Sequence, residues 1–219
     1  MKSNKYQEID KSTHLEDGVV IGNVFPKYTT TNPVGRFLVG RFHKVLDMLV
    51  DDINPETIHE VGCGEGFLLS RYHQSNRRLL GTDFSSRIIQ IARKNCAEYI
   101  ANGEIFFQVA DIYSMISDHH GAEVILVSEV LEHLEAPDEA LKVLKTLAKP
   151  YIIFSVPREP VWRLLNITRG SYLSQMGNTP GHLKHWTRRG FVRLISQHFE
   201  VLKVFSPLPW TIILGRTIH

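Results

Sequence analysis

The sequence predicts a single doubly wound α/β domain with a mostly parallel sheet of seven strands, and two observations carry this prediction. Short apolar segments alternate with amphipathic segments of helical spacing between about residues 57 and 156, a rhythm typical of a parallel sheet covered by helices on both faces. A glycine-rich turn follows the first apolar segment, and ligands of such sheets bind at the carboxyl ends of the strands. A length of 219 residues suits one domain, here 1–219.

The composition excludes several classes of protein. Hydrophobic residues make up 43% and charged residues 22% of the chain, which is ordinary for a globular protein and excludes disorder as its main state. Lys plus Arg is 25 and Asp plus Glu is 23, a balance that does not indicate nucleic-acid binding and gives no reason to expect DNA as a partner. The two cysteines, Cys63 and Cys96, exclude a disulfide framework and a zinc site built on thiolates.

No segment looks like a membrane or export signal. The residues after Met1 are polar, without an apolar signal core. No run approaches the ~18 apolar residues that a spanning helix needs. We therefore expect a cytoplasmic protein.

The expected strands are short apolar runs, and the run at 122–128 is almost continuously apolar, as in strands buried inside a parallel sheet. They cover residues 57–61, 78–82, 104–110, 122–128, 151–156, 200–206 and 210–214. The last two are joined by Pro207-Leu208-Pro209, a link short enough for an antiparallel pair at the edge of the sheet.

The expected helices show helical spacing of apolar residues and recognisable start signals. They cover residues 34–50, 65–72, 85–100, 137–148 and 187–198. Ser85 suits the N-cap of the third, and Pro137 suits the first turn of the fourth. Residues 1–33 are polar and irregular, and we expect residues 1–52 to form a cap on the domain.

The glycine-rich turn is His59-Glu60-Val61-Gly62-Cys63-Gly64-Glu65-Gly66. Glycines at the end of a strand let the backbone turn tightly and approach a ligand closely. A dinucleotide fingerprint needs its third glycine where this chain has Phe67, so a pyrophosphate cradle is disfavoured. Asp83 ends the second strand, seventeen residues after Gly66, where a carboxylate can accept hydrogen bonds from both hydroxyls of a ribose.

This loop resembles motif I of class I S-adenosylmethionine (SAM)-dependent methyltransferases, with Glu60 in the acidic position before it. The resemblance implies a Rossmann-like methyltransferase fold and SAM as cofactor. It also implies that the N-terminal cap covers the cofactor, with Tyr28, Asn32, Arg36 and Phe37 nearby. The expected cofactor residues lie at the ends of four strands: Glu60, Gly62, Cys63, Gly64, Gly66, Asp83, Phe84, Ala110, Asp111, Ile112 and Ser128. We expect Cys63 to be a small loop residue and Cys96 to pack in the core.

A second group of polar residues follows the fourth strand. Glu129, Glu132 and His133 are spaced i, i+3 and i+4 and would share one face of a helical turn. With His182 they could bind Mg²⁺ or another divalent metal, which would lower the pKa of an acceptor oxygen. Alternatively, His133 acts as a general base without metal, with Glu132 and His182 as further catalytic candidates, or the group is structural.

The Glu-x-x-Glu-His run resembles the ubiquinone-biosynthesis O-methyltransferases. These enzymes also carry an insertion after the fifth strand that ends in a Gly-Thr-His-like segment, where this chain has Asn178-Thr179-Pro180-Gly181-His182. More loosely, two Glu and two His before a Trp-Thr-Arg resemble the small-RNA 2′-O-methyltransferases, where they bind a metal. His182 fits the fourth ligand better than His185, since Trp186-Thr187-Arg188 follows both.

The insertion at 157–186 is rich in aromatic and basic residues, and we expect it to form a lid. It contains Arg158, Trp162, Arg163, Leu165, Arg169, Tyr172 and Leu173. Such a segment can pack on the domain, rest on a membrane interface, or bind a carboxylate or phosphate of the acceptor through arginine.

The function that these patterns favour is SAM-dependent O-methylation of a small, phenolic or lipid-like acceptor by in-line displacement. The alternatives are a metal-dependent RNA 2′-O-methyltransferase, which the near-neutral charge disfavours, a small-molecule N-methyltransferase, and a cofactor-binding regulator without turnover. The sequence leaves the acceptor and the oligomeric state open.

Overall fold

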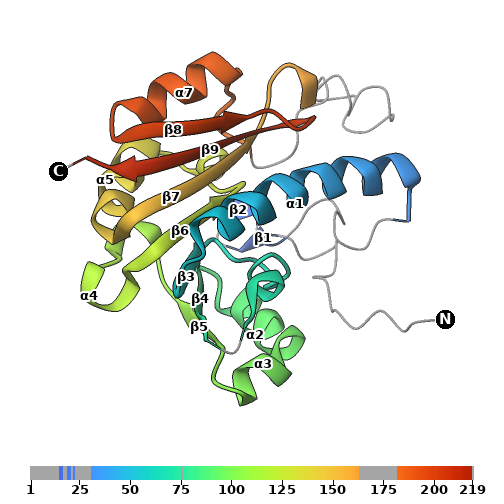
Figure 1. Cartoon of the computed structure of the whole chain (residues 1–219), viewed down its shortest axis with the longest axis vertical. Helices are drawn as coiled ribbons and strands as arrows, with labels where there is room; N and C mark the ends of the chain where they lie inside the picture. The colour runs from blue at the N-terminus through green and yellow to red at the C-terminus, as the bar shows by residue number, and fades with distance from the viewer. Residues whose placement is uncertain are drawn as a thin grey trace.

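The computed structural model describes residues 15–16, 19–20, 22, 31–74, 76–162 and 182–218. Its centre is a seven-stranded sheet in the order β5-β4-β3-β6-β7-β9-β8 (Figure 1). The strands are β3 (Thr57–Val61), β4 (Arg78–Asp83), β5 (Ile105–Val109), β6 (Ala122–Ser128), β7 (Ala148–Pro157), β8 (Phe199–Phe205) and β9 (Trp210–Thr217). The five strands from β3 to β7 are parallel, and β9 is antiparallel to both of its neighbours. The predicted fold class is therefore confirmed, including the antiparallel pair at the edge.

The helices are α1 (Pro33–Ile53), α2 (Ser86–Asn95), α3 (Ala97–Ala101), α4 (Ser117–His120), α5 (Pro137–Leu147) and α7 (Arg188–Ser196). Three short 3₁₀ turns join them: η2 (Leu69–Tyr72), η3 (Ile112–Ser114) and η4 (Leu131–His133). A two-stranded sheet of β1 (Leu15–Glu16) and β2 (Val19–Val20) lies in the N-terminal segment that we expected to be irregular. Among the described residues, no helix is both long and apolar enough to cross a membrane.

Two hydrophobic layers cover the two faces of the sheet, because side chains alternate along each buried strand. On β6, Leu126 packs with α1 and α2, while Val127 packs with α5 and α7 on the other face. The same alternation separates Ile212 from Ile213 on β9. β6 is buried along nearly its whole length and reads as an almost continuous apolar run, as predicted for 122–128.

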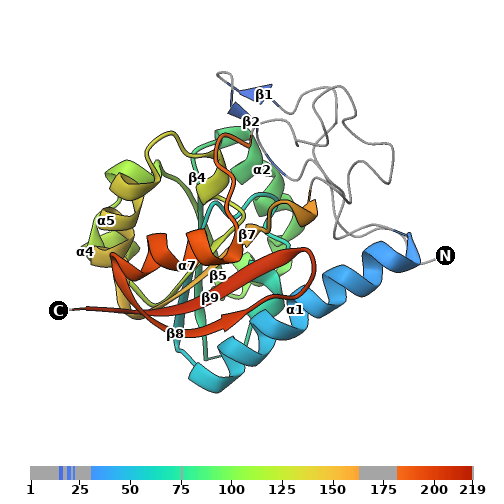
Figure 2. The ribbon, with the colours of Figure 1, turned by 90° about the horizontal axis from the view of Figure 1, so that it is seen from above.

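Helix α1 places its N-terminus at the edge of the sheet where the ligand site is expected. It ends just before β3 begins, and its N-terminal half projects past the sheet (Figures 1 and 2). The side chain of Asn32 caps it by accepting bonds from the backbone N–H groups of Val34 and Gly35 at 2.9 and 3.2 Å. Phe37 remains 63% exposed on this half, and Tyr28 lies outside the described residues.

Two predicted helices are corrected. The helix at 65–72 is a turn followed by η2, since Gly66 has a φ of +81° that no right-handed helix accepts. The side-chain amide of Asn95 donates a hydrogen bond from Nδ2 to the carbonyl oxygen of Glu65 at 3.0 Å. In a helix at 65–72, this carbonyl would instead accept from a backbone N–H. The helix at 85–100 is broken into α2 and α3 at Cys96, which is fully buried with a φ of −109° and a ψ of 20°. Ser85 caps α2 as predicted, accepting from the N–H of Ile88 at 3.2 Å.

Candidate functional site

The glycine loop joins β3 to η2 in a fixed, left-handed path. Gly62, Gly64 and Gly66 have φ values of +73°, +52° and +81°, which side chains rarely adopt. The N–H groups of Gly62 and Cys63 both donate to the carbonyl of Thr82 on β4, at 2.8 and 2.9 Å. The loop is therefore held across the carboxyl ends of two adjacent strands.

Close packing adds a second reason for glycine. A Cβ on Gly62 would collide with Cγ2 of Val130, and one on Gly66 would lie 2.9 Å from Cζ of Phe107. Because Val130 stands between Glu129 and η4, the first contact joins the glycine loop to the acidic segment after β6. The two groups that the sequence singled out are thus neighbours.

Asp83 is the anchor between the loop and α2. Its Oδ2 accepts from the N–H of Gly64 at 3.2 Å, and its Oδ1 accepts from the N–H of Ser85 at 3.1 Å. The side chain is half-buried, and Phe84 beside it is 43% exposed. These two bonds fix the orientation of the Asp83 carboxylate between the glycine loop and α2.

The other expected cofactor residues lie along the same edge. Glu60 and Ser128 are buried near the ends of β3 and β6, and the hydroxyl of Ser128 lies 3.0 Å from that of Ser155. Asp111 is exposed and caps η3 by accepting from the N–H of Tyr113 at 3.0 Å. Ala110 is half-buried beside it, and Ile112 is buried. The sheet order β5-β4-β3-β6 brings these ends together.

Both cysteines are buried and unsuited to nucleophilic chemistry. Burial, and then the charges of Asp83 and Glu60, raise the pKa of the Cys63 thiol well above its usual value. Burial, followed by Glu60, raises the pKa of Cys96 to about 11. Both thiols are therefore protonated near neutral pH, and the thiolate is the reactive form.

The segment after β6 turns sharply at Glu129, whose φ of +56° is left-handed. Its backbone N–H donates to the carbonyl of Ser155 at 2.9 Å. The indole Nε1–H of Trp210 donates to Oε1 of Glu129 at 2.6 Å. Only Leu131–His133 form a 3₁₀ turn, so Glu129 does not share a helix with Glu132 and His133 as its spacing suggested.

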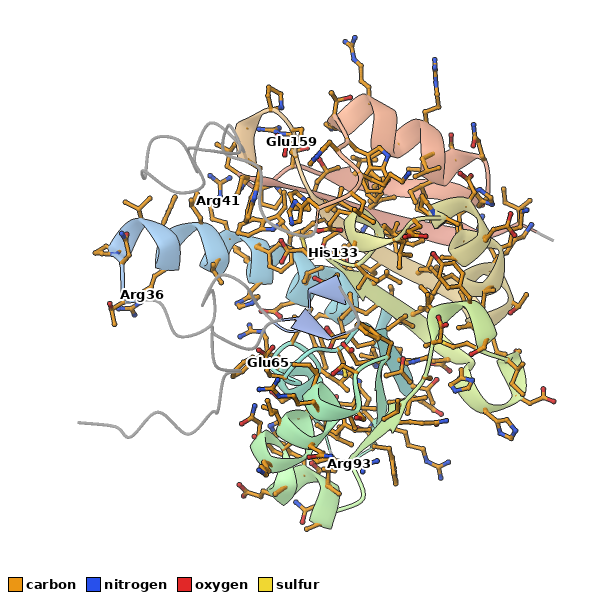
Figure 3. The ribbon with its side chains drawn as sticks, turned by 180° about the vertical axis from the view of Figure 1, so that it is seen from behind. Arg36, Arg41, Glu65, Arg93, His133 and Glu159 are labelled. Atoms are coloured by element: carbon orange, nitrogen blue, oxygen red, sulfur yellow. The ribbon has the colours of Figure 1, made fainter. Side chains whose placement is uncertain are left out.

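His182 reaches this turn from the far end of the insertion. The backbone N–H groups of Leu183 and Lys184 donate to the carbonyl of Glu132 at 2.8 and 3.0 Å. Ligand atoms of Glu132, His133 and His182 then lie within 4.8 Å of one another, and the two imidazole rings meet edge to face with centroids 5.0 Å apart. Figure 3 shows His133 near the middle of the molecule.

The cluster has the chemistry of a base or of a divalent-ion site. Burial, and then the charges of His133 and His185, lower the pKa of His182 to about 4, although Glu129 opposes them. A neutral imidazole keeps a lone pair that can take a proton or bind a metal. Glu132 is only 1% exposed, and imidazole with carboxylate suits Mg²⁺, Mn²⁺ or Zn²⁺. The residues present therefore fit a divalent ion.

Aromatic side chains that the sequence analysis did not place at the site flank this cluster. The indole of Trp162 stacks on His182 with ring centroids 6.4 Å apart, and Trp210 lies 5.8 Å from Trp162 and 4.8 Å from Phe42. The sequence around Trp210 predicted only that this residue begins a strand, and no motif indicated that it lies at the site. Residues 163–181, with Arg163, Arg169, Tyr172 and Leu173, lie outside the described residues.

The residues next to the insertion form a second polar group. Nδ1 of His185 lies 3.6 Å from Oε1 of Glu159, and the backbone N–H of Glu159 donates to the carbonyl of Trp186 at 3.0 Å. Figure 3 places Glu159 at the end of the strand that leads into the insertion. His185 is thus engaged with Glu159, and the ligand cluster contains His182.

The parallel sheet with an antiparallel seventh strand, and the glycine loop beside an acid at the end of β4, define the class of the protein as an α/β fold of the methyltransferase type. Residues 58–151 match the family described as "Methyltransferase domain". Ubiquinone biosynthesis O-methyltransferase of Coxiella burnetii (strain RSA 331 / Henzerling II) is 26% identical over 162 residues, which cover 66% of this chain and 68% of that protein.

Solved structures agree on the fold. Magnesium protoporphyrin IX methyltransferase from Synechocystis PCC 6803 with bound SAH has a TM-score of 0.64 at 16% identity, over 86% of this chain and 89% of that one. The methyltransferase domain of a bacterial Hen1 protein (CtHen1-C) has a TM-score of 0.65 at 19% identity, over 83% of this chain and 100% of that one. Residues 58–151 are therefore a class I SAM-dependent methyltransferase domain.

Proposed function

We propose that the protein transfers the methyl group of SAM to an oxygen of a small acceptor. The observation that best supports this proposal is the close contact between Gly62 and the side chain of Val130. It sets the glycine loop against the segment that bears Glu129, Glu132 and His133, so that a cofactor group and a proton-accepting group share one end of the sheet. The name of the Coxiella relative, an O-methyltransferase, supports oxygen over nitrogen.

The chain's contribution to the reaction is binding, orientation and proton removal. SAM, when bound, supplies a methyl group on a positively charged sulfonium. The backbone of the glycine loop and the carboxylate of Asp83 would hold the methionine and ribose parts. His133 or His182 would accept the proton of the acceptor hydroxyl. Holding acceptor and methyl in line supplies much of the remaining rate enhancement.

A divalent ion is the second element of the proposal. Glu132, His133 and His182, with Glu129 beside them, would hold Mg²⁺ or a similar ion and use it as a Lewis acid toward the acceptor oxygen. The indoles of Trp162 and Trp210 would suit a planar, phenolic acceptor because flat rings stack on them. The insertion would close over this acceptor as a lid or rest on a membrane that carries it.

The test is a calorimetric titration with S-adenosylhomocysteine, run in Mg²⁺ and again in EDTA. Micromolar binding in both buffers is expected, and a heat that depends on Mg²⁺ would support an ion near the cofactor. Binding indifferent to Mg²⁺ would favour His133 as a metal-free base. Absence of binding in both buffers would overturn the assignment of the glycine loop.

An RNA 2′-hydroxyl is the second candidate acceptor, because Glu132, His133 and His182 come together and supply one of the two glutamates and both histidines of the set that resembles the small-RNA branch. Such an enzyme would bind RNA with a steep dependence on salt. Filter binding of a short RNA duplex at low and moderate salt separates the two candidates, since a small-molecule enzyme should show no salt-sensitive RNA binding.

A further inference from the structure

The two edges of the sheet differ in how well they are protected. Among the described residues, β8 and β5 are the outermost of the seven strands (Figure 1). An edge strand exposes backbone N–H and C=O groups that can pair with a further strand, and proteins block this with charges, proline or bulges. On β8, Glu200 forms an ion pair with Arg216 at 2.6 Å. Lys203 forms another with Asp52 at 2.9 Å, and the register of the strand shifts between Val201 and Lys203.

The other edge strand, β5, has no protection of this kind in its sequence. Its residues, Ile-Phe-Phe-Gln-Val, include no charge and no proline, and they pair with β4 residue by residue. Phe106 is 54% exposed and Val109 is 47% exposed. Leu80, which lies beside Phe106 in the register with β4, is half-buried. This edge is therefore apolar and uncharged, and exposed strands of this kind are sites of association.

The hydrogen bonds to β4 show which backbone groups of β5 face outward. The N–H of Leu79 donates to the carbonyl of Glu104 at 3.0 Å. At the other end, the N–H of Ala110 donates to the carbonyl of Asp83 at 3.0 Å. Because residues that bond to the neighbouring strand alternate along a parallel pair, the even-numbered residues of β5 face β4. The odd-numbered residues turn their N–H and C=O groups outward: Ile105, Phe107 and Val109.

One of these outward groups contacts a side chain of α2. Nη2 of Arg93 donates to the carbonyl of Phe107 at 2.7 Å, which agrees with the outward direction of that carbonyl. Figure 3 labels Arg93 on α2. A backbone carbonyl has two lone pairs, and the bond from Arg93 uses one of them. Arg93 therefore does not by itself prevent a further strand from pairing with β5.

We propose that β5 pairs antiparallel with β5 of a second copy of this chain, so that two sheets join into one across a two-fold axis. The strand carries no charge, so two copies meet without the repulsion that like charges cause when they lie opposite each other. Antiparallel pairing sets the start of one β5 beside the end of the other. Arg78 is exposed at the start of β4, and Asp111 is exposed just after β5. Opposite charges therefore meet at both ends of the joint.

A pair of β5 strands is a closed assembly. A two-fold interface uses the same surface of both copies, so the dimer covers both β5 edges and leaves the two protected β8 edges at the ends of the joined sheet. Association therefore stops at two chains. A strand of five residues gives a small interface, so we expect a weak dimer with a micromolar dissociation constant. A strand of another protein is the alternative occupant, and it would leave the purified chain monomeric.

The first measurement is sedimentation velocity of the full chain between about 1 and 100 µM, where a micromolar dimer forms. Phe106→Lys places a charge on the exposed side of β5 and should weaken the dimer at least about tenfold. Leu202→Lys is the matched control, because Leu202 is 37% exposed on β8, and it should leave the dimer unchanged. Thermal unfolding shows whether both variants remain folded. A chain that is monomeric throughout, a species larger than a dimer, or equal weakening in both variants would overturn the proposal.

The second measurement locates the interface and, like the first, needs no cofactor, so it does not depend on the proposed function. Backbone hydrogen exchange of Ile105, Phe107 and Val109 should slow as the protein concentration rises, because pairing protects their N–H groups. Exchange of Phe106 and Gln108, which bond to β4, should not change. Val109→Pro removes one outward donor, as proline does at natural edges, and should also weaken the dimer. A dimer without slower exchange at the three outward positions would assign the interface to another surface and overturn the pairing of β5.

Discussion

The backbone N–H of Leu183 donates to the carbonyl of Glu132 at 2.8 Å, and this bond joins the far end of the insertion to the turn after β6. It brings the imidazole of His182 to that of His133. A site that depends on such a contact exists only in the folded chain, because neither segment contains a full set of ligands or bases by itself.

Asp83 should be essential for cofactor binding. Asp83→Ala removes the carboxylate that would accept from the ribose hydroxyls, and hydrogen bonds to a charged group contribute about 1.5–3 kcal/mol. We expect S-adenosylhomocysteine to bind at least about tenfold more weakly by calorimetry, since 1.4 kcal/mol corresponds to that factor. Asp118→Ala, at an exposed position in α4, should leave the affinity unchanged. Unchanged affinity in Asp83→Ala would contradict the assignment of the site.

Gly62 should be intolerant of any side chain. Gly62→Ala places a Cβ against Val130 at a φ of +73°, so overpacking of about 1–3 kcal/mol adds to the backbone strain. Gly103→Ala is the matched control, since its φ is also +73° but its Cβ would have no neighbour within 4 Å in the part of the chain that the structure describes. Urea unfolding should show a lower free energy of unfolding for Gly62→Ala than for Gly103→Ala. Equal losses would mean that Val130 yields freely.

Replacing Gly40 with alanine should stabilise the fold, in contrast to the same change at Gly62. It lies inside α1, where its added Cβ would meet no atom of the described residues within 4 Å, and glycine costs about 0.5–1 kcal/mol relative to alanine in a helix. Gly40→Ala should raise the free energy of unfolding by that amount in urea titrations. A decrease would show that something else occupies this face of α1.

His59 should make the fold sensitive to acid. Its Nδ1 lies 2.7 Å from the carbonyl of His120 and its Nε2 lies 2.8 Å from Oγ1 of Thr82. The neutral ring therefore donates through the first atom and accepts through the second. Burial lowers the pKa to about 4, although the bond to the carbonyl of His120 opposes this.

The sign of the effect follows from the unfolded chain, where a histidine has a pKa near its usual value of 6.5. Above that pH both states are neutral and His59 contributes no pH dependence. As the pH falls from 6.5 to about 4, only the unfolded state gains the proton, so stability is lost, by about 3 kcal/mol in full. His182 acts in the same direction. Comparing His59→Gln with the unmodified protein in urea at pH 7 and pH 5 isolates the share of His59, and parallel losses would contradict the prediction.

Local signals in the sequence determined the frame of the site. The strand Thr57–Val61 has the predicted bounds, because apolar residues and the glycines after them define both ends within a few residues. Ser85 caps its helix and Asp83 stands beside the loop for the same reason, since caps and loop anchors are set by neighbours in the chain. The sheet order followed from the family resemblance and not from the pattern.

The tertiary structure decided which residues far apart in the sequence come into contact. Glu65 does not begin a helix because its carbonyl oxygen accepts a hydrogen bond from the side chain of Asn95 on α2. The apolar spacing of residues 85–100 predicts one continuous helix, but the helix is broken at Cys96, whose side chain is buried against Gly66. Glu129 meets Trp210 only because β9 inserts between β7 and β8. Contacts between residues so far apart depend on how the layers pack, which the local spacing of residues does not encode.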